Sequence, residues 1–161
     1  MTKTVNYRNW IFEVDYERTK EVYGELPSGS PERCTCSDCK NYSVNRENIY
    51  PQEIKNLLSE LGIDYKKEVE IYSICRLNNG QYQYGGWFHF KGRIKVGRDC
   101  KVDLGGGTSQ FQLETITDGF DIGFTKDFAL RYFEDEEKND LIQIEFTAIS
   151  DWVIGKELES E

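Results

Sequence analysis

Three cysteines lie within six residues of the chain, at Cys34, Cys36 and Cys39. Thiolates are soft ligands, and a metal ion is held where several of them converge on one point. A turn that leads into a helix can bring such a set together. The helix N-terminus also stabilises a thiolate through its free N–H groups and the positive end of its dipole. The spacing therefore leaves three alternatives: a zinc site, a redox-active thiol, or thiols that pack and cap the helix.

A structural zinc site needs four ligands, and the sequence offers no second cysteine pair at ligand spacing. Cys75 and Cys100 alternate in phase with apolar neighbours, so we expect both to be small buried hydrophobes. His89 is the only histidine and the remaining candidate for a fourth ligand. It stands in an aromatic run, however, where a histidine more commonly packs and forms a hydrogen bond. The zinc hypothesis names as ligands Cys34, Cys36, Cys39 and His89.

The residues around the cluster predict how it is positioned. Residues 24–35 are rich in Gly, Pro and Ser and predict a long loop. Ser37 or Asp38 can cap a following helix, whose inward-facing residues recur at spacings of three and four as far as Ile49. A second helix is predicted over 51–61, where a proline suits the first turn and a glycine the end.

Alternating apolar and polar residues predict a sheet around these helices. Strands are expected over 10–16, 69–77, 82–90, 94–96, 111–113, 120–124 and 142–146, and 127–133 is ambiguous between helix and strand. The predicted fold class is α+β, an antiparallel-rich sheet of about six to seven strands with a helical pair inserted after the first strand. The 161 residues fit a single domain, 1–161, with disorder expected only at the ends.

The charge balance restricts the classes of partner. The formal net charge is −9, and residues 134–161 hold ten acids and two lysines. Phosphate neutralisation needs clustered Lys and Arg, so we expect no nucleic-acid partner and no anionic membrane surface. No stretch has the length of a membrane span and the start does not resemble a signal peptide, so we expect a cytoplasmic protein with reduced thiols. The acidic excess favours solubility or a basic protein partner.

A glycine run at Gly105, Gly106 and Gly107 belongs to a segment, Val102–Thr108, that resembles the phosphate-binding loop of the actin and heat-shock ATPase superfamily. The chain is too short for the two subdomains of that superfamily. It also lacks the second phosphate loop and has Gln110 where an aspartate is usual. We expect a connection between two strands and no ATP site.

Motifs spread over residues 30–155 resemble a family of small bacterial proteins without a known activity. The matching segments are Cys34-x-Cys36-x-x-Cys39-x-Asn41, Leu57-Leu58-x-x-Leu61-Gly62-Ile63-Asp64, Tyr84-Gly85-Gly86-Trp87-x-His89-Phe90-x-Gly92, Phe120-x-Ile122-x-Phe124, Glu145-Phe146 and Trp152-Val153. The chain departs from the family at Asp151, where a proline is expected. The resemblance implies a bacterial, cytoplasmic, single-domain protein in which the cysteine cluster and His89 recur together, which favours His89 as the fourth ligand.

Two functions from different classes remain open. One histidine and no discernible Ser/His/Asp grouping give no basis for a hydrolase triad. The first hypothesis is a non-catalytic protein-binding or accessory domain. The alternative is a zinc- or thiol-dependent enzyme that uses Cys34, Cys36 and Cys39. Metal content distinguishes the two.

Overall fold

The computed structural model describes residues 2–126 and 132–159. It contains a seven-stranded antiparallel sheet in the order β1-β2-β4-β9-β8-β7, with β3 also paired to β4, and a separate two-stranded sheet, β5-β6. The predicted α+β class and the expected number of strands are confirmed. The strands are β1 (Lys3–Tyr7), β2 (Trp10–Val14), β3 (Glu70–Arg76), β4 (Tyr82–Val96), β5 (Lys101–Gly105), β6 (Thr108–Phe111), β7 (Glu114–Thr117), β8 (Phe120–Thr125) and β9 (Leu141–Ser150).

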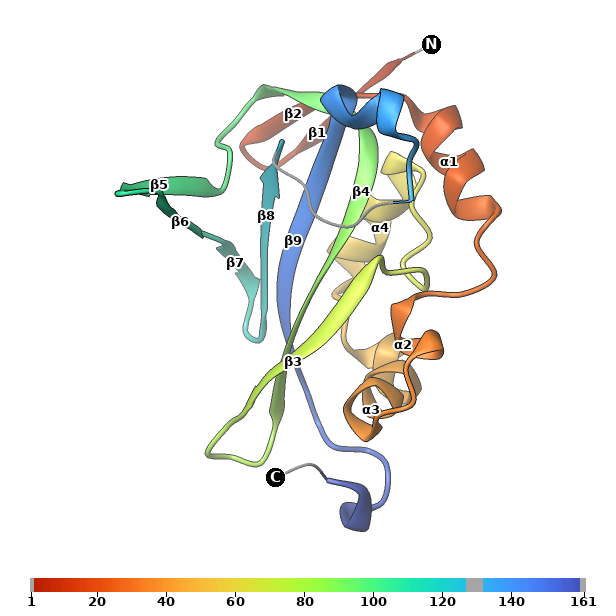
Figure 1. Ribbon diagram of the computed structural model, residues 1–161, viewed down its shortest axis with the longest axis vertical. Coiled ribbons are helices and arrows are strands. Elements are labelled where there is room, and N and C mark those ends of the chain that lie inside the picture. Colours follow the sequence, from red (N-terminus) through yellow and green to blue (C-terminus); the bar gives the residue numbers. More distant parts are fainter. Residues whose placement is uncertain (1, 127–131, 160–161) are drawn as a thin grey trace.

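The helices come mostly between β2 and β3 and gather on one side of the sheet (Figure 1). The α-helices are α1 (Tyr16–Gly24), α2 (Ser30–Arg33), α3 (Ser37–Asn45) and α4 (Gln52–Leu61), and the 3-10 helices are η1 (Arg46–Asn48), η2 (Asp135–Asp140) and η3 (Lys156–Leu158). The predicted pair is α3 and α4. Helix α4 ends as expected at Gly62, whose left-handed conformation (φ 89°) closes the helix.

Aromatic side chains fill the space between the sheet and the helices. Even-numbered residues of β4 point toward the helices because side chains alternate along a strand. Tyr84 packs edge-on against Tyr42 of α3, and Phe88 and Phe146 pack against Tyr50, which lies between η1 and α4. These rings are all nearly inaccessible to solvent. The apolar surface that they bury is the main source of stability for a chain with a modest apolar fraction.

Helix α1 takes the place of a strand along part of β4. One edge of β4 pairs with β3 up to Trp87 and with β2 from Gly92 onward, which leaves a gap between them. In this gap the Tyr23 hydroxyl donates to the His89 carbonyl oxygen (2.9 Å) and accepts from the His89 N–H (3.0 Å). Thr19 Oγ1 accepts from the Lys91 N–H at 3.0 Å. The gap is therefore closed by side chains rather than by another ladder.

Several boundaries differ from those predicted. A strand before residue 10, β1, and the helix α1 were not predicted, and the expected loop 24–35 contains α2. Residues 94–96 continue β4, and the hairpin expected between 111–113 and 120–124 is formed by β7 and β8. The glycine run connects β5 to β6 as expected, in a hairpin that projects from the body (Figure 1). The ambiguous segment 127–133 lies mostly outside the described residues.

Candidate metal centre

The cysteine cluster lies at the connection between α2 and α3. Cys34 directly follows α2 and its N–H donates to the Pro31 carbonyl oxygen at 3.3 Å. Cys36 has extended backbone angles (φ −74°, ψ 156°) and is the N-cap of α3. Its Sγ accepts from the Cys39 N–H at 3.4 Å. The prediction that Ser37 or Asp38 caps this helix is wrong, because the helix begins at Ser37 and the residue before it is the one whose side chain faces the free N–H groups.

The three sulfur atoms converge. All Sγ atoms of Cys34, Cys36 and Cys39 lie within 4.8 Å of one another, and the first two are 3.2 Å apart. Tetrahedral zinc with Zn–S bonds of about 2.3 Å separates its sulfurs by about 3.8 Å, which falls inside this range. Cys34 and Cys36 are exposed, whereas Cys39 is buried. The group is therefore a surface site with one buried ligand.

The thiols differ in their ease of ionisation. The backbone N–H of Cys36 lowers the pKa of the Cys34 thiol, and hydrogen bonds within the cluster lower it further. Burial raises the pKa of the Cys39 thiol, and its two sulfur neighbours act in the same direction. A bound metal ion would supply positive charge beside Cys39 and so favour the thiolate form of this buried ligand.

Helix α3, which carries Cys39, is anchored by the side chain of Asn41. This amide is fully buried and donates to Tyr84 Oη (3.2 Å) and to the Asp151 carbonyl oxygen (3.0 Å). Its own oxygen accepts from the Val153 N–H at 2.7 Å. Tyr84 Oη in turn donates to the Asp38 carbonyl oxygen (2.9 Å). The start of α3 is thus fixed to β4 and to the segment after β9, a role for Asn41 that its type and position did not reveal.

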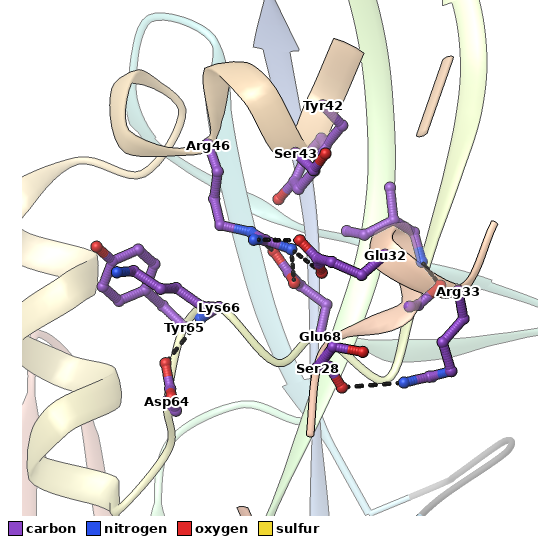
Figure 2. A network of polar contacts seen from close by, with 12 residues as sticks. Ser28, Glu32, Arg33, Tyr42, Ser43, Arg46, Asp64, Tyr65, Lys66 and Glu68 are labelled. Carbon is purple, nitrogen blue, oxygen red and sulfur yellow. Dashed lines mark hydrogen bonds and ion pairs between the residues drawn. The ribbon is translucent and has the colours of Figure 1, made fainter. Parts of the chain in front are cut away.

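A buried ion network joins α2 to the chain that follows α3 (Figure 2). Arg46, in η1 after α3, donates two hydrogen bonds of 2.8 Å to the Glu32 carboxylate of α2. It donates two more to Glu68, at 3.0 and 2.9 Å. Glu68 has no solvent-accessible surface and also accepts from Tyr50 Oη at 2.7 Å. Arg46 therefore joins α2, the end of α3 and the chain that enters β3.

The charges of this network depend on one another. Burial raises the pKa of Glu68, and the charge and hydrogen bonds of Arg46 and the Tyr50 hydroxyl act against that rise. The sequence places Arg46 on the inward face of a helix. A guanidinium on such a face is the signal that points to a buried acidic partner.

The structure does not bring His89 to the cysteines. Its imidazole has no solvent-accessible surface and its Nε2 lies 2.8 Å from Gln143 Oε1 of β9. His89 projects from the face of β4 opposite to Tyr84, the residue that contacts α3, because odd and even residues alternate. Among the described residues, the group that could hold a metal consists of Cys34, Cys36 and Cys39.

The other two cysteines have different environments. Cys100 is buried as expected, and burial raises the pKa of its thiol to about 12. Cys75 is exposed, so its predicted burial is wrong. Both faces of β3 are exposed from Tyr72 to Arg76, with Ile74 44 % exposed, so the alternation along this part of the strand does not distinguish a buried face from an open one.

A second polar group lies beside His89 on the same face of the sheet. Gln143 Nε2 donates to Glu145 Oε1, and Glu145 is almost completely buried. Burial raises the pKa of the Glu145 carboxyl to about 7, although the Gln143 amide opposes the rise. Sequence reasoning did not select Glu145, although an acid inside the apolar run of β9 was the available signal.

Comparisons with known proteins identify no relative of this chain. No family model matches the chain, and neither a curated protein nor a solved structure matches it. Within the described part of the chain, no helix combines the length and apolar character needed to cross a membrane.

Proposed function

We propose that this protein binds one zinc ion through the thiolates of Cys34, Cys36 and Cys39, and that the ion stabilises a non-catalytic protein-binding domain. The observation that carries the proposal is the convergence of three Sγ atoms within 4.8 Å of one another. The three residues come from the α2–α3 connection and from the first turn of α3. A metal bound to all three would fix that connection against the helix.

Zinc is the metal that best suits this donor set. Thiolates select zinc, copper(I) or iron–sulfur clusters, and an iron–sulfur cluster needs four protein ligands where this group supplies three. A fourth zinc ligand can be water, which reaches the ion past the exposed Cys34 and Cys36. We do not propose His89 as that ligand, because its imidazole is buried on the other face of β4.

The binding partner that we propose is a basic protein in the bacterial cytoplasm, where thiols stay reduced. The acidic residues of the η2 region support this proposal, since Glu134, Asp135, Glu136 and Asp140 are all exposed. Like charge repels nucleic acid and anionic lipid, so neither is a partner in this proposal. Binding of random-sequence DNA at physiological salt would count against it.

A zinc- or thiol-dependent enzyme is the second candidate. Catalytic zinc sites keep three protein ligands and an open fourth position, and two of the three ligands here face solvent. Both candidates leave the fourth position to water, so ligand exchange at the metal does not separate them. Turnover of a substrate by the zinc-loaded protein that Cys36→Ser loses and Cys75→Ser keeps would favour the enzyme.

The test is the metal content of the purified protein together with matched cysteine variants. We expect about one zinc per chain and little iron or copper. Cys36→Ser should abolish zinc binding, because it removes one of the three converging sulfurs, while the serine hydroxyl can still cap α3. Cys75→Ser is the control, since Cys75 is equally exposed but lies outside the cluster. A wild-type protein that takes up no zinc after reconstitution under reducing conditions would refute the proposal.

A further inference from the structure

Two of the three cluster sulfurs form a contact pair that is open to solvent. Cys34 and Cys36 are exposed and their Sγ atoms are 3.2 Å apart. A disulfide bond has an S–S length of about 2.0 Å, so closure needs a movement of about 1 Å. Cys39 is 7 % exposed and its surroundings shield its sulfur from a soluble oxidant. The geometry thus separates one oxidisable pair from one protected thiol.

The backbone around the pair favours this assignment. Cys36 is held in place as the cap of α3, where its Sγ faces the Cys39 N–H. Cys34 belongs to neither helix and has extended backbone angles (φ −101°, ψ 142°). Its side chain can therefore turn toward a sulfur that is already positioned, with little change in either helix.

We propose that Cys34 and Cys36 form a disulfide on reaction with a hydroperoxide, and that this bond turns off the metal site. The disulfide chemistry needs the two thiols and the hydroperoxide, whereas the loss of metal rests on the proposed zinc function. Solvent-accessible thiols beside a resolving cysteine are the usual arrangement of redox-sensing sites.

The reaction has two balanced steps. The Cys34 thiolate attacks a peroxide oxygen, so that an S–O bond forms, the O–O bond breaks and the departing hydroxide or alkoxide takes up a proton. The Cys36 thiolate then attacks the sulfur of the sulfenic acid, so that the S–S bond forms and hydroxide leaves to become water. The two thiols lose two electrons in total and the peroxide gains them.

The consequence for the metal is the loss of two of three ligands. Cys39 alone remains, and it is buried. A single thiol cannot hold zinc against solvent. An exposed disulfide between residues so close in the chain is readily reduced, so a thiol reductant should restore the site.

The experiment treats the zinc-loaded and the metal-free protein with hydrogen peroxide and follows them by intact mass, peptide mapping and a chromophoric zinc chelator. We expect each chain to lose two hydrogen atoms, a Cys34–Cys36 crosslink, release of all bound zinc, and recovery with a reductant. Cys75→Ser should behave as wild type. Cys36→Ser should form no intramolecular disulfide and retain a sulfenic acid on Cys34 that a dimedone probe traps.

The outcomes separate this inference from the proposed function. A Cys34–Cys36 crosslink in a protein that never takes up zinc would overturn the zinc site and leave the redox pair. Zinc binding without a crosslink, or a crosslink that includes Cys39 or Cys75 instead, would overturn the redox pair and leave the zinc site.

Discussion

Replacing Arg46 by methionine tests whether the network that joins Arg46 to Glu32 and Glu68 is a buried ion cluster. The variant keeps most of the side-chain volume and removes the cation. Arg46 donates two hydrogen bonds to Glu32 and two to Glu68. Glu32 is partly exposed and can be solvated again, but Glu68 has no accessible surface and would lose its counter-ion. The main cost therefore falls on Glu68.

The magnitude follows from that difference. Breaking a buried ion pair by removing one partner costs about 3–5 kcal/mol, against about 0–1 kcal/mol for an exposed pair. For a chain of this length that corresponds to a fall in Tm of roughly 6–20 °C. Arg8→Met is the matched control, because Arg8 also donates a forked pair of hydrogen bonds, to Glu53, but both side chains of that pair are exposed. We expect the control to cost much less than Arg46→Met.

Acid should reduce the penalty of Arg46→Met. Without Arg46, the pKa of Glu68 in the folded protein rises further above its unfolded value, since burial already raises it. A group whose folded pKa is raised makes the protein less stable as pH rises through the window between the two values. The stability difference between wild type and variant should therefore be smaller at pH 5 than at pH 8. Urea unfolding followed by circular dichroism measures both quantities.

A double variant completes the test. Arg46→Met with Glu68→Gln removes both charges, and we expect it to recover part of the stability lost in Arg46→Met. A cost of Arg46→Met no greater than that of Arg8→Met, or a penalty that grows toward acidic pH, would show that Arg46 does not act as the counter-ion of a buried Glu68.

Three further outcomes are expected. A zinc chelator should lower the Tm of wild type and of Cys75→Ser but leave the Tm of Cys36→Ser unchanged, because only the first two proteins hold the ion. Scanning fluorimetry with and without chelator measures these Tm values. Glu145→Gln should be more stable than wild type at pH 8 by up to about 3 kcal/mol. The reason is that wild-type stability falls as pH rises from about 4.5 to the raised pKa of Glu145, about 7, and the glutamine variant has no carboxyl to ionise. An equal pH dependence in both proteins would contradict this prediction. Tyr23→Phe should cost about 1–3 kcal/mol, because it leaves the His89 N–H and carbonyl oxygen without the hydroxyl, whereas Tyr65→Phe, at a surface hydroxyl, should cost less in the same urea assay.

Local patterns predicted the elements that have strong local signals. The alternation of residues 82–90 identified the centre of β4, and the glycine after 51–61 identified the end of α4. β1 was missed because its residues are few and mostly polar, and its turn to β2 uses Arg8 at φ 50° instead of a glycine. α1 has only three buried residues, so its periodicity is weak.

The cysteine part of the candidate site was predictable because its signal is also local. Cys34, Cys36 and Cys39 are neighbours in the chain, so a single turn brings them together. Whether His89 joins them depends on which face of β4 meets α3, and that is decided by the packing of Tyr84 against Tyr42, two residues far apart in sequence. Local periodicity carries no information on such a contact.

The helix that closes the gap in the edge of β4 also divides the amide protons of that strand into two groups. Successive N–H groups along a strand point to opposite edges, so those of Phe88 and Phe90 face β9 while those of His89 and Lys91 face Tyr23 and Thr19 of α1. Hydrogen exchange at the His89 and Lys91 amides then reports on the detachment of α1 from β4 alone. Exchange at the Phe88 and Phe90 amides reports on the separation of β4 from β9. Once α1 lifts, the middle of the central strand becomes a short unpaired edge that another chain can join, so loss of this one helix is a route to aggregation of a protein whose sheet is otherwise intact.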